Sequence, residues 1–160
     1  MKKEKTEKAD TDTEGFVIIE HPADTGISLT AESLEKAFEI AAEGMFSIIC
    51  SIKKVKPQKQ IRMRISSSPE MGVEGLLVAW LEKLIYLHEI KKMLFSKFDV
   101  AIKENKSKKI KLSANVYGEK IKPSFHELYL AVKAPTYHKL SLKKDFANKG
   151  RWTGMVIFDV

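Results

Sequence analysis

The chain has 160 residues, of which 44% are hydrophobic and 31% are charged, and its formal net charge at pH 7 is +7. This composition is typical of an ordinary globular protein and excludes a disordered chain, and the length suits one domain with a hydrophobic core. The most apolar stretch, Leu76 to Leu87, is too short to cross a membrane and contains Glu82 and Lys83, so we expect no membrane association.

The N-terminal segment differs from the rest of the chain in charge. Residues 1–14 hold four lysines and five acidic residues and lack the apolar centre of a secretory signal. We therefore expect a disordered charged tail over residues 1–14 and a domain over residues 15–160 with a net charge of +8. Cys50 is the only cysteine, which excludes an internal disulfide and fits a cytoplasmic protein with a buried thiol.

Hydrophobic periodicity predicts two helices and a larger number of strands. Ser33 is placed to cap the first helix, whose apolar residues recur at a spacing of three and four up to Ile49. Ser68 and Pro69 predict the start of the second helix, which continues through Leu87. The predicted strands are Phe16–Glu20, Gly26–Ala31, Ile61–Ile65, Phe98–Lys103, Ile110–Val116, Tyr129–Ala134, Leu140–Leu142 and Trp152–Asp159. This order predicts an α+β fold, in which a largely antiparallel sheet is packed by two main helices in a single domain.

The positive charge is concentrated in three parts of the domain. They are Lys53 to Arg64, Lys103 to Lys111 and Lys139 to Arg151. Such clusters attract RNA or an acidic protein surface, although lysines also keep exposed strand edges soluble. No cluster carries regularly interleaved aromatic residues, which disfavours stacking on single-stranded bases.

Two acidic residues stand at predicted strand ends. Asp24 precedes the second predicted strand, and Asp159 ends the last one, beside the carboxylate of Val160. Chain ends usually fray unless something holds them, and we expect a hard cation to do so here. Calcium and magnesium prefer oxygen ligands of this kind. The competing interpretation is that Asp24 belongs to an Asp-Thr-Gly turn and that Asp159 is merely solvated.

Histidines raise a second metal hypothesis. Imidazole is a common zinc ligand, but His21, His126 and His138 fit no compact zinc motif and have no cysteine pair beside them. Hydrogen-bonded structural roles remain open for each of them.

Five segments in their order resemble the archease family and together span nearly all of residues 16–160. They are His21-Pro22-Ala23-Asp24-Thr25-Gly26, Ala41-Ala42-Glu43-Gly44-Met45-Phe46, Leu76 to Leu87, Val132 to His138, and Phe158-Asp159-Val160. The resemblance implies an accessory protein, not an enzyme, that assists a GTP-dependent RNA-splicing ligase. In that family the accessory protein promotes guanylation of the ligase histidine and multiple turnover, in tRNA splicing or RNA repair.

The resemblance also implies a divalent-metal site. Carried over by position, its ligands are Asp24 and Asp159, with the carboxylate of Val160 able to complete it, and calcium is the favoured ion ahead of magnesium or manganese. His21, Lys133 and His138 are expected around this site, in contact with the ligase or a phosphate, while RNA itself is contacted indirectly or weakly. Because a buried ammonium needs an acidic partner, Lys133 in its apolar strand is expected to pair with Asp24 or Asp159.

The sequence departs from the family pattern at three positions. Ala79 stands where an acid is usual, Phe125 where an arginine often precedes the histidine, and Pro22 where threonine is usual. Two other classes of function remain as alternatives. One is a small metal-dependent hydrolase, which the absence of a nucleophile beside a base disfavours. The other is a basic RNA-binding or chaperone-like module that does not depend on a ligase.

Overall fold

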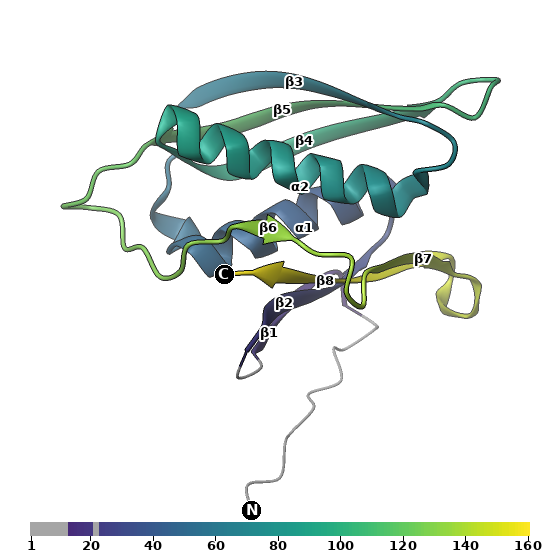
Figure 1. The fold of residues 1–160 in the computed structure, drawn as a ribbon, viewed down its shortest axis with the longest axis horizontal. Helices are drawn as coiled ribbons and strands as arrows, with labels where there is room; N and C mark the ends of the chain where they lie inside the picture. The colour runs from purple at the N-terminus through teal and green to yellow at the C-terminus, as the bar shows by residue number, and fades with distance from the viewer. Residues whose placement is uncertain (1–12, 21–22) are drawn as a thin grey trace, which may run out of the picture.

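The computed structural model describes residues 13–20 and 23–160, and the predicted tail up to residue 12, together with His21 and Pro22, lies outside the described residues. Figure 1 shows the arrangement of the elements. In chain order they are β1 (Gly15–Glu20), β2 (Thr25–Ala31), α1 (Leu34–Ile49), the short 3₁₀ helix η1 (Ile52–Lys54), β3 (Lys59–Ser67), α2 (Gly72–Lys91), β4 (Met93–Glu104), β5 (Ile110–Lys120), β6 (Ala134–Pro135), β7 (Ser141–Asp145), the 3₁₀ helix η2 (Phe146–Asn148) and β8 (Arg151–Asp159).

The strands divide between two antiparallel sheets, and both helices lie between them (Figure 1). One sheet has the order β1-β2-β8-β6, with β7 also paired to β8, and the other has the order β3-β5-β4. The predicted α+β class is confirmed. The strands form two sheets where one was expected, because strand periodicity identifies strands but does not say which of them pair.

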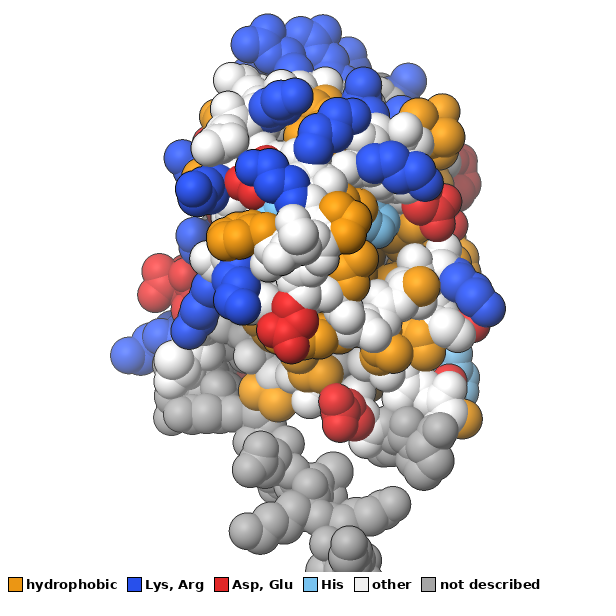
Figure 2. All heavy atoms as spheres, turned by 90° about the vertical axis from the view of Figure 1, so that its left-hand side faces the viewer, with side chains coloured by type: hydrophobic (Ala, Val, Ile, Leu, Met, Phe, Trp, Pro, Cys, Tyr) orange, Lys and Arg blue, Asp and Glu red, His pale blue; other side chains and the backbone are white. Residues whose placement is uncertain are grey.

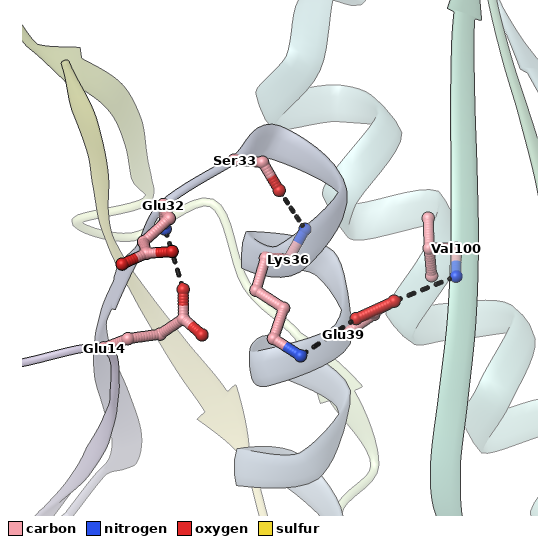
Figure 3. A network of polar contacts seen from close by, with 6 residues as sticks. All are labelled: Glu14, Glu32, Ser33, Lys36, Glu39 and Val100. Atoms are coloured by element: carbon pink, nitrogen blue, oxygen red, sulfur yellow. Dashed lines mark hydrogen bonds and ion pairs between the residues drawn. The ribbon is translucent and has the colours of Figure 1, made fainter.

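Helix α1 begins where the sequence predicts it. The Ser33 side chain accepts a hydrogen bond from the Lys36 backbone amide at 3.1 Å, which satisfies one of the free amides at the start of the helix. Figure 3 shows this cap together with an ion pair of 3.6 Å between Lys36 and Glu39. Glu39 also accepts a hydrogen bond of 3.2 Å from the backbone amide of Val100. Helix α1 is thereby joined to the free edge of strand β4.

The start of helix α2 was predicted wrongly at Ser68 and Pro69. The Ser68 carbonyl instead accepts a hydrogen bond from the Met71 amide at 3.1 Å and closes a separate turn. Gly72 follows with a φ of 62°, a conformation that glycine adopts at little cost, and the helix proper starts there. Most of the apolar residues predicted to face the core are buried, and Trp80 donates a hydrogen bond of 3.0 Å to the Phe38 carbonyl of α1.

Residues 121–133 connect β5 of one sheet to β6 of the other, and we call them the crossover segment. The predicted strand Tyr129–Ala134 is wrong except at its last residue, because only Ala134 and Pro135 form strand β6. Backbone bonds tie the segment to the end of α1: the Ser51 amide donates to Glu127, and the Tyr129 amide donates to Ile49. No helix in the described part of the chain is long and apolar enough to span a membrane.

Candidate metal centre

Asp24 and Asp159 lie at the same end of two neighbouring strands. In the antiparallel pairing of β2 with β8, Thr25 is opposite Phe158. Asp24 comes directly before Thr25, and Asp159 comes directly after Phe158, so each acid is one residue beyond this last pair. Opposite Cα atoms in antiparallel strands are about 5 Å apart. The pairing therefore brings two residues separated by most of the chain to one end of one sheet.

Strand β6 fixes Asp159 from its other side. Ala134 is opposite Asp159 in the register, and the Lys133 backbone amide donates a hydrogen bond of 2.8 Å to the Asp159 carbonyl. Thr136 donates from both its amide and its hydroxyl to the Ile157 carbonyl, at 2.8 and 2.9 Å. Strand β8 is thus bonded on both sides close to its last residue. The expected cation is not required to hold this end, because backbone hydrogen bonds already do so.

The side chains of the two acids remain available. Both Asp24 and Asp159 are exposed, and neither carboxylate has a hydrogen bond or an ion pair with another described residue. Val160 is also exposed, at 37%. Carboxylate oxygens are the ligands that hard cations prefer, so the donor chemistry at this end of the sheet suits calcium, magnesium or manganese.

The other predicted site residues are arranged less closely. Lys133 is exposed, so the prediction of a buried ammonium was wrong, and among the described residues it has no ion pair. Its place beside Asp159 comes from its backbone. His138 is exposed in the turn after β6, without a described contact to either acid. His21 lies outside the described residues.

His126 has a structural environment that argues against a zinc ligand. Its Nδ1 accepts a hydrogen bond of 2.9 Å from the Lys122 amide, and its Nε2 lies 2.8 Å from Glu119 Oε1. A neutral ring that accepts at Nδ1 carries its proton on Nε2, beside the carboxylate, but the two groups do not form a hydrogen bond. Within residues 13–20 and 23–160, no group of three histidine, cysteine or acidic side chains could hold a metal ion.

The buried partner of His126 had no signal in the sequence. Glu119 stands seven residues earlier, near the end of strand β5, and its other oxygen accepts a hydrogen bond of 2.9 Å from the Lys56 amide. The side chains of His126 and Glu119 are only 1% and 4% exposed. Neither Nε2 nor Oε1 has a hydrogen-bond partner in the described part of the chain, so the two buried groups are close neighbours without a hydrogen bond between them. A lysine-rich, alternating strand end gives no sign that one of its acids is buried.

The fold and the site define a class of protein: a small two-sheet α+β domain whose unpartnered acids lie at an exposed sheet end. Comparison with known proteins identifies the family. The model of the archease protein family matches residues 16–160. The archease of Pyrococcus furiosus is 36% identical over 141 residues, which cover 88% of this chain and 95% of that protein. The archease of Saccharolobus islandicus is 40% identical over 129 residues, which cover 81% and 88%.

A solved structure agrees with these relatives. The solution structure of Methanobacterium thermoautotrophicum protein 1598 superimposes with a TM-score of 0.78 at 32% identity, and the match covers 92% of this chain and 100% of that one. The chain belongs to the archease family. This membership supports an accessory role.

Proposed function

We propose that this protein is a metal-binding accessory factor of a GTP-dependent RNA-splicing ligase in the cytoplasm. It promotes guanylation of the ligase histidine and repeated turnover, in tRNA splicing or RNA repair, and has no catalytic residues of its own. The family supports the accessory role. The observation that carries the metal site is the register that brings Asp24 and Asp159 to one end of β2 and β8, with both side chains exposed.

Asp24 and Asp159 would hold the cation, and the Val160 carboxylate is the third proposed ligand. Calcium is the first choice of ion because it accepts several oxygen ligands in flexible geometry, and magnesium or manganese are the alternatives. When bound, such an ion supplies concentrated positive charge that can attract a phosphate or a carboxylate of a partner. Few protein ligands leave coordination positions open to such groups. Exposure at the sheet end suits a site that a second protein must reach.

Two further described residues are proposed as contacts with the ligase or with a phosphate. Lys133 is exposed, and its backbone amide is hydrogen-bonded to the Asp159 carbonyl. Its side chain therefore extends from a position next to the two aspartates. His138 is exposed five residues later. His21, three residues before Asp24, completes this proposed set. None of the three is needed as a metal ligand in this proposal.

The decisive experiment follows covalent guanylate on the ligase with time, in a mixture of the purified protein, its candidate ligase, GTP and a divalent metal. Asp24→Asn and Asp159→Asn should each abolish the stimulation while leaving the thermal unfolding temperature in EDTA nearly unchanged. Glu82→Gln is the matched control, because it removes one exposed carboxylate from helix α2. Full stimulation by the Asp24→Asn/Asp159→Asn double variant would refute the site.

The third ligand has its own test. One added residue after Val160 moves the terminal carboxylate away from Asp159 and should weaken calcium binding measured by calorimetry. An amide-capped C-terminus should weaken it in the same way, since the charge is removed without added bulk. Unchanged affinity in both variants would remove Val160 from the ligand set.

A further inference from the structure

The outer face of the β3-β5-β4 sheet is open to solvent. Along these strands, alternate residues such as Met63, Phe98 and Leu112 are buried against the helices, and the residues between them point away from the core. We call this second set the outer face. No helix of the described residues covers it, and it forms the top of the molecule in Figure 1. An open sheet of this kind normally carries polar side chains of both signs.

The charge of the outer face is almost entirely positive. It carries five cations and one carboxylate, which are Arg62, Arg64, Lys97, Lys103, Lys111 and Asp99. Two of the basic clusters recognised in the sequence, Lys53 to Arg64 and Lys103 to Lys111, therefore contribute to one surface. Figure 2 shows Lys and Arg side chains gathered along the top of the molecule, where this sheet lies. The sequence could not show this gathering, because it depends on the pairing of β3 and β4 with β5.

The strand register places several of these cations next to one another. Arg62 and Arg64 lie on the same side of β3, two residues apart, which corresponds to about 7 Å along a strand. Ser66 is opposite Lys111, and Lys111 is opposite Lys103, so the next row crosses all three strands. Neither arginine side chain has a hydrogen bond or an ion pair with another described residue. The two planar guanidinium groups are thus free to bind an anion.

The arginines border a shallow depression of about 370 Å³. Small residues, Ala101 and Ser113, occupy neighbouring positions of its floor. Asn115 also lines it and accepts a hydrogen bond of 2.8 Å from Gln60. Two carboxylates reach the depression: Glu39 is already bonded to Lys36 and Val100, whereas Asp99 is exposed. Asp99 is two strands from Arg62, which is about 10 Å across the sheet.

We propose that this face binds the phosphate backbone of single-stranded RNA without reading its sequence. Arg62 and Arg64 would each form bidentate hydrogen bonds with phosphate oxygens, a geometry for which arginine is better suited than lysine. Ser113 and Asn115 offer neutral polar groups between the cations, which can hydrogen-bond a 2′-hydroxyl and so favour RNA over DNA. Tyr117 is the one aromatic residue of the face, and Lys97 lies 4.9 Å above its ring. Without further aromatic platforms, base-specific stacking is not expected.

Binding of a fluorescein-labelled single-stranded RNA dodecamer of mixed sequence, followed by anisotropy at 50 to 200 mM KCl in EDTA, tests this proposal. Arg62→Gln/Arg64→Gln should weaken binding about tenfold at 50 mM salt and lower the magnitude of the slope of log affinity against log salt by about 1.4, since two phosphate contacts are lost. Asp99→Asn should tighten binding, because a repelling carboxylate is lost. The unfolding temperature should change little in these variants, since the three side chains are exposed.

The matched control is Lys139→Gln/Lys143→Gln, which removes the same charge from the region of β7 in the other sheet. It should leave RNA affinity within about twofold, and an equal loss in this control would show that net charge alone is responsible. The proposal also fails if the wild-type protein does not bind RNA at 50 mM salt. Equal affinity for a single-stranded DNA dodecamer of the same sequence would overturn the RNA assignment, and efficient competition by a polyglutamate peptide would point to an acidic protein instead. The assay contains neither ligase nor metal, so its failure is separate from failure of the proposed accessory function.

Discussion

Two groups of acidic residues in this protein have opposite surroundings. Glu119 is 3% exposed, lies 2.8 Å from His126 and accepts a hydrogen bond from the Lys56 amide. Asp24 and Asp159 are exposed, and their carboxylates have no partner among the described residues. In both cases the backbone nearby is held firmly. The two groups differ in the carboxylate oxygens that an external ligand can reach. Glu119 offers none because it is buried, whereas both oxygens of each aspartate are available.

This contrast separates structural acids from candidate functional ones. The pair of Glu119 and His126 links the loop before β3, the end of β5 and the crossover segment, all through contacts inside the protein. A buried charged or polar group whose partner is removed destabilises the fold, because its desolvation is no longer compensated. An exposed carboxylate costs little to remove and matters only to what it binds. Variants of the buried pair should therefore change the free energy of unfolding, and variants of the exposed aspartates should change ligand binding.

The largest expected effect is on stability at the buried pair. Glu119→Ala should lower the free energy of unfolding by about 3 kcal/mol, because the Lys56 amide loses its acceptor and the buried His126 ring loses its neighbouring carboxylate. Asp24→Ala should change it by less than about 0.5 kcal/mol in EDTA. Urea unfolding measures both. The double variant Glu119→Leu/His126→Leu should be less destabilised than the sum of the single variants, and simple additivity would show that the two side chains are not coupled.

The next largest effect is stabilisation by calcium, which should depend on the exposed aspartates and not on the buried pair. Free calcium at about 100 times its dissociation constant should raise the free energy of unfolding of the wild-type protein by about 2.7 kcal/mol, through binding to the folded state. For a chain of this size that corresponds to an increase of about 5 to 10 °C in the unfolding temperature. Asp159→Asn should lose most of this increase, and Glu82→Gln should keep it. An increase that persists in Asp159→Asn would locate the cation elsewhere.

The sequence predicted the parts of the fold that depend on local pattern. The first helix and its Ser33 cap follow from residue spacing, and most strands lie where alternation placed them. The predicted start of the second helix was wrong. The left-handed backbone of Gly72 allows a turn to precede the helix, and serine followed by proline is also common at the start of such turns. The strand predicted over residues 129–133 was wrong, because an apolar, extended segment forms a strand only if a free strand edge lies beside it.

Less of the candidate site could be predicted from local pattern. The resemblance to archease suggested Asp24 and Asp159, and the register of β2 with β8 could be known only from the fold. Lys133 was expected to be buried because its neighbours are apolar, yet the segment runs over the surface. The pair of Glu119 with His126 and the basic outer face depend on contacts between distant segments, which no residue spacing in one chain reveals.

Glu43 is intermediate in burial between Glu119 and the two exposed aspartates, and its substitution gives the smallest predicted effect. It is half-buried on helix α1, and its carboxylate has no hydrogen bond with the described residues. Burial raises its pKa; Lys36 partly opposes this shift, and Glu39 and Glu14 add to it. The folded state therefore holds the proton more tightly than the unfolded state does. This contribution stabilises the fold at low pH and is lost as the pH rises through the raised pKa of the folded protein.

Glu43→Gln removes that titration, since glutamine keeps the shape of the side chain without the charge. The variant should unfold about 1 to 2 °C above the wild type at pH 7, a small gain because the side chain is partly solvated. The gain should shrink toward pH 4, where the wild-type carboxyl is protonated and also neutral. Thermal unfolding at both pH values measures the difference, with Glu82→Gln as the exposed control. A gain of the same size at both pH values would mean that packing, not charge, distinguishes the half-buried carboxyl from the exposed aspartates.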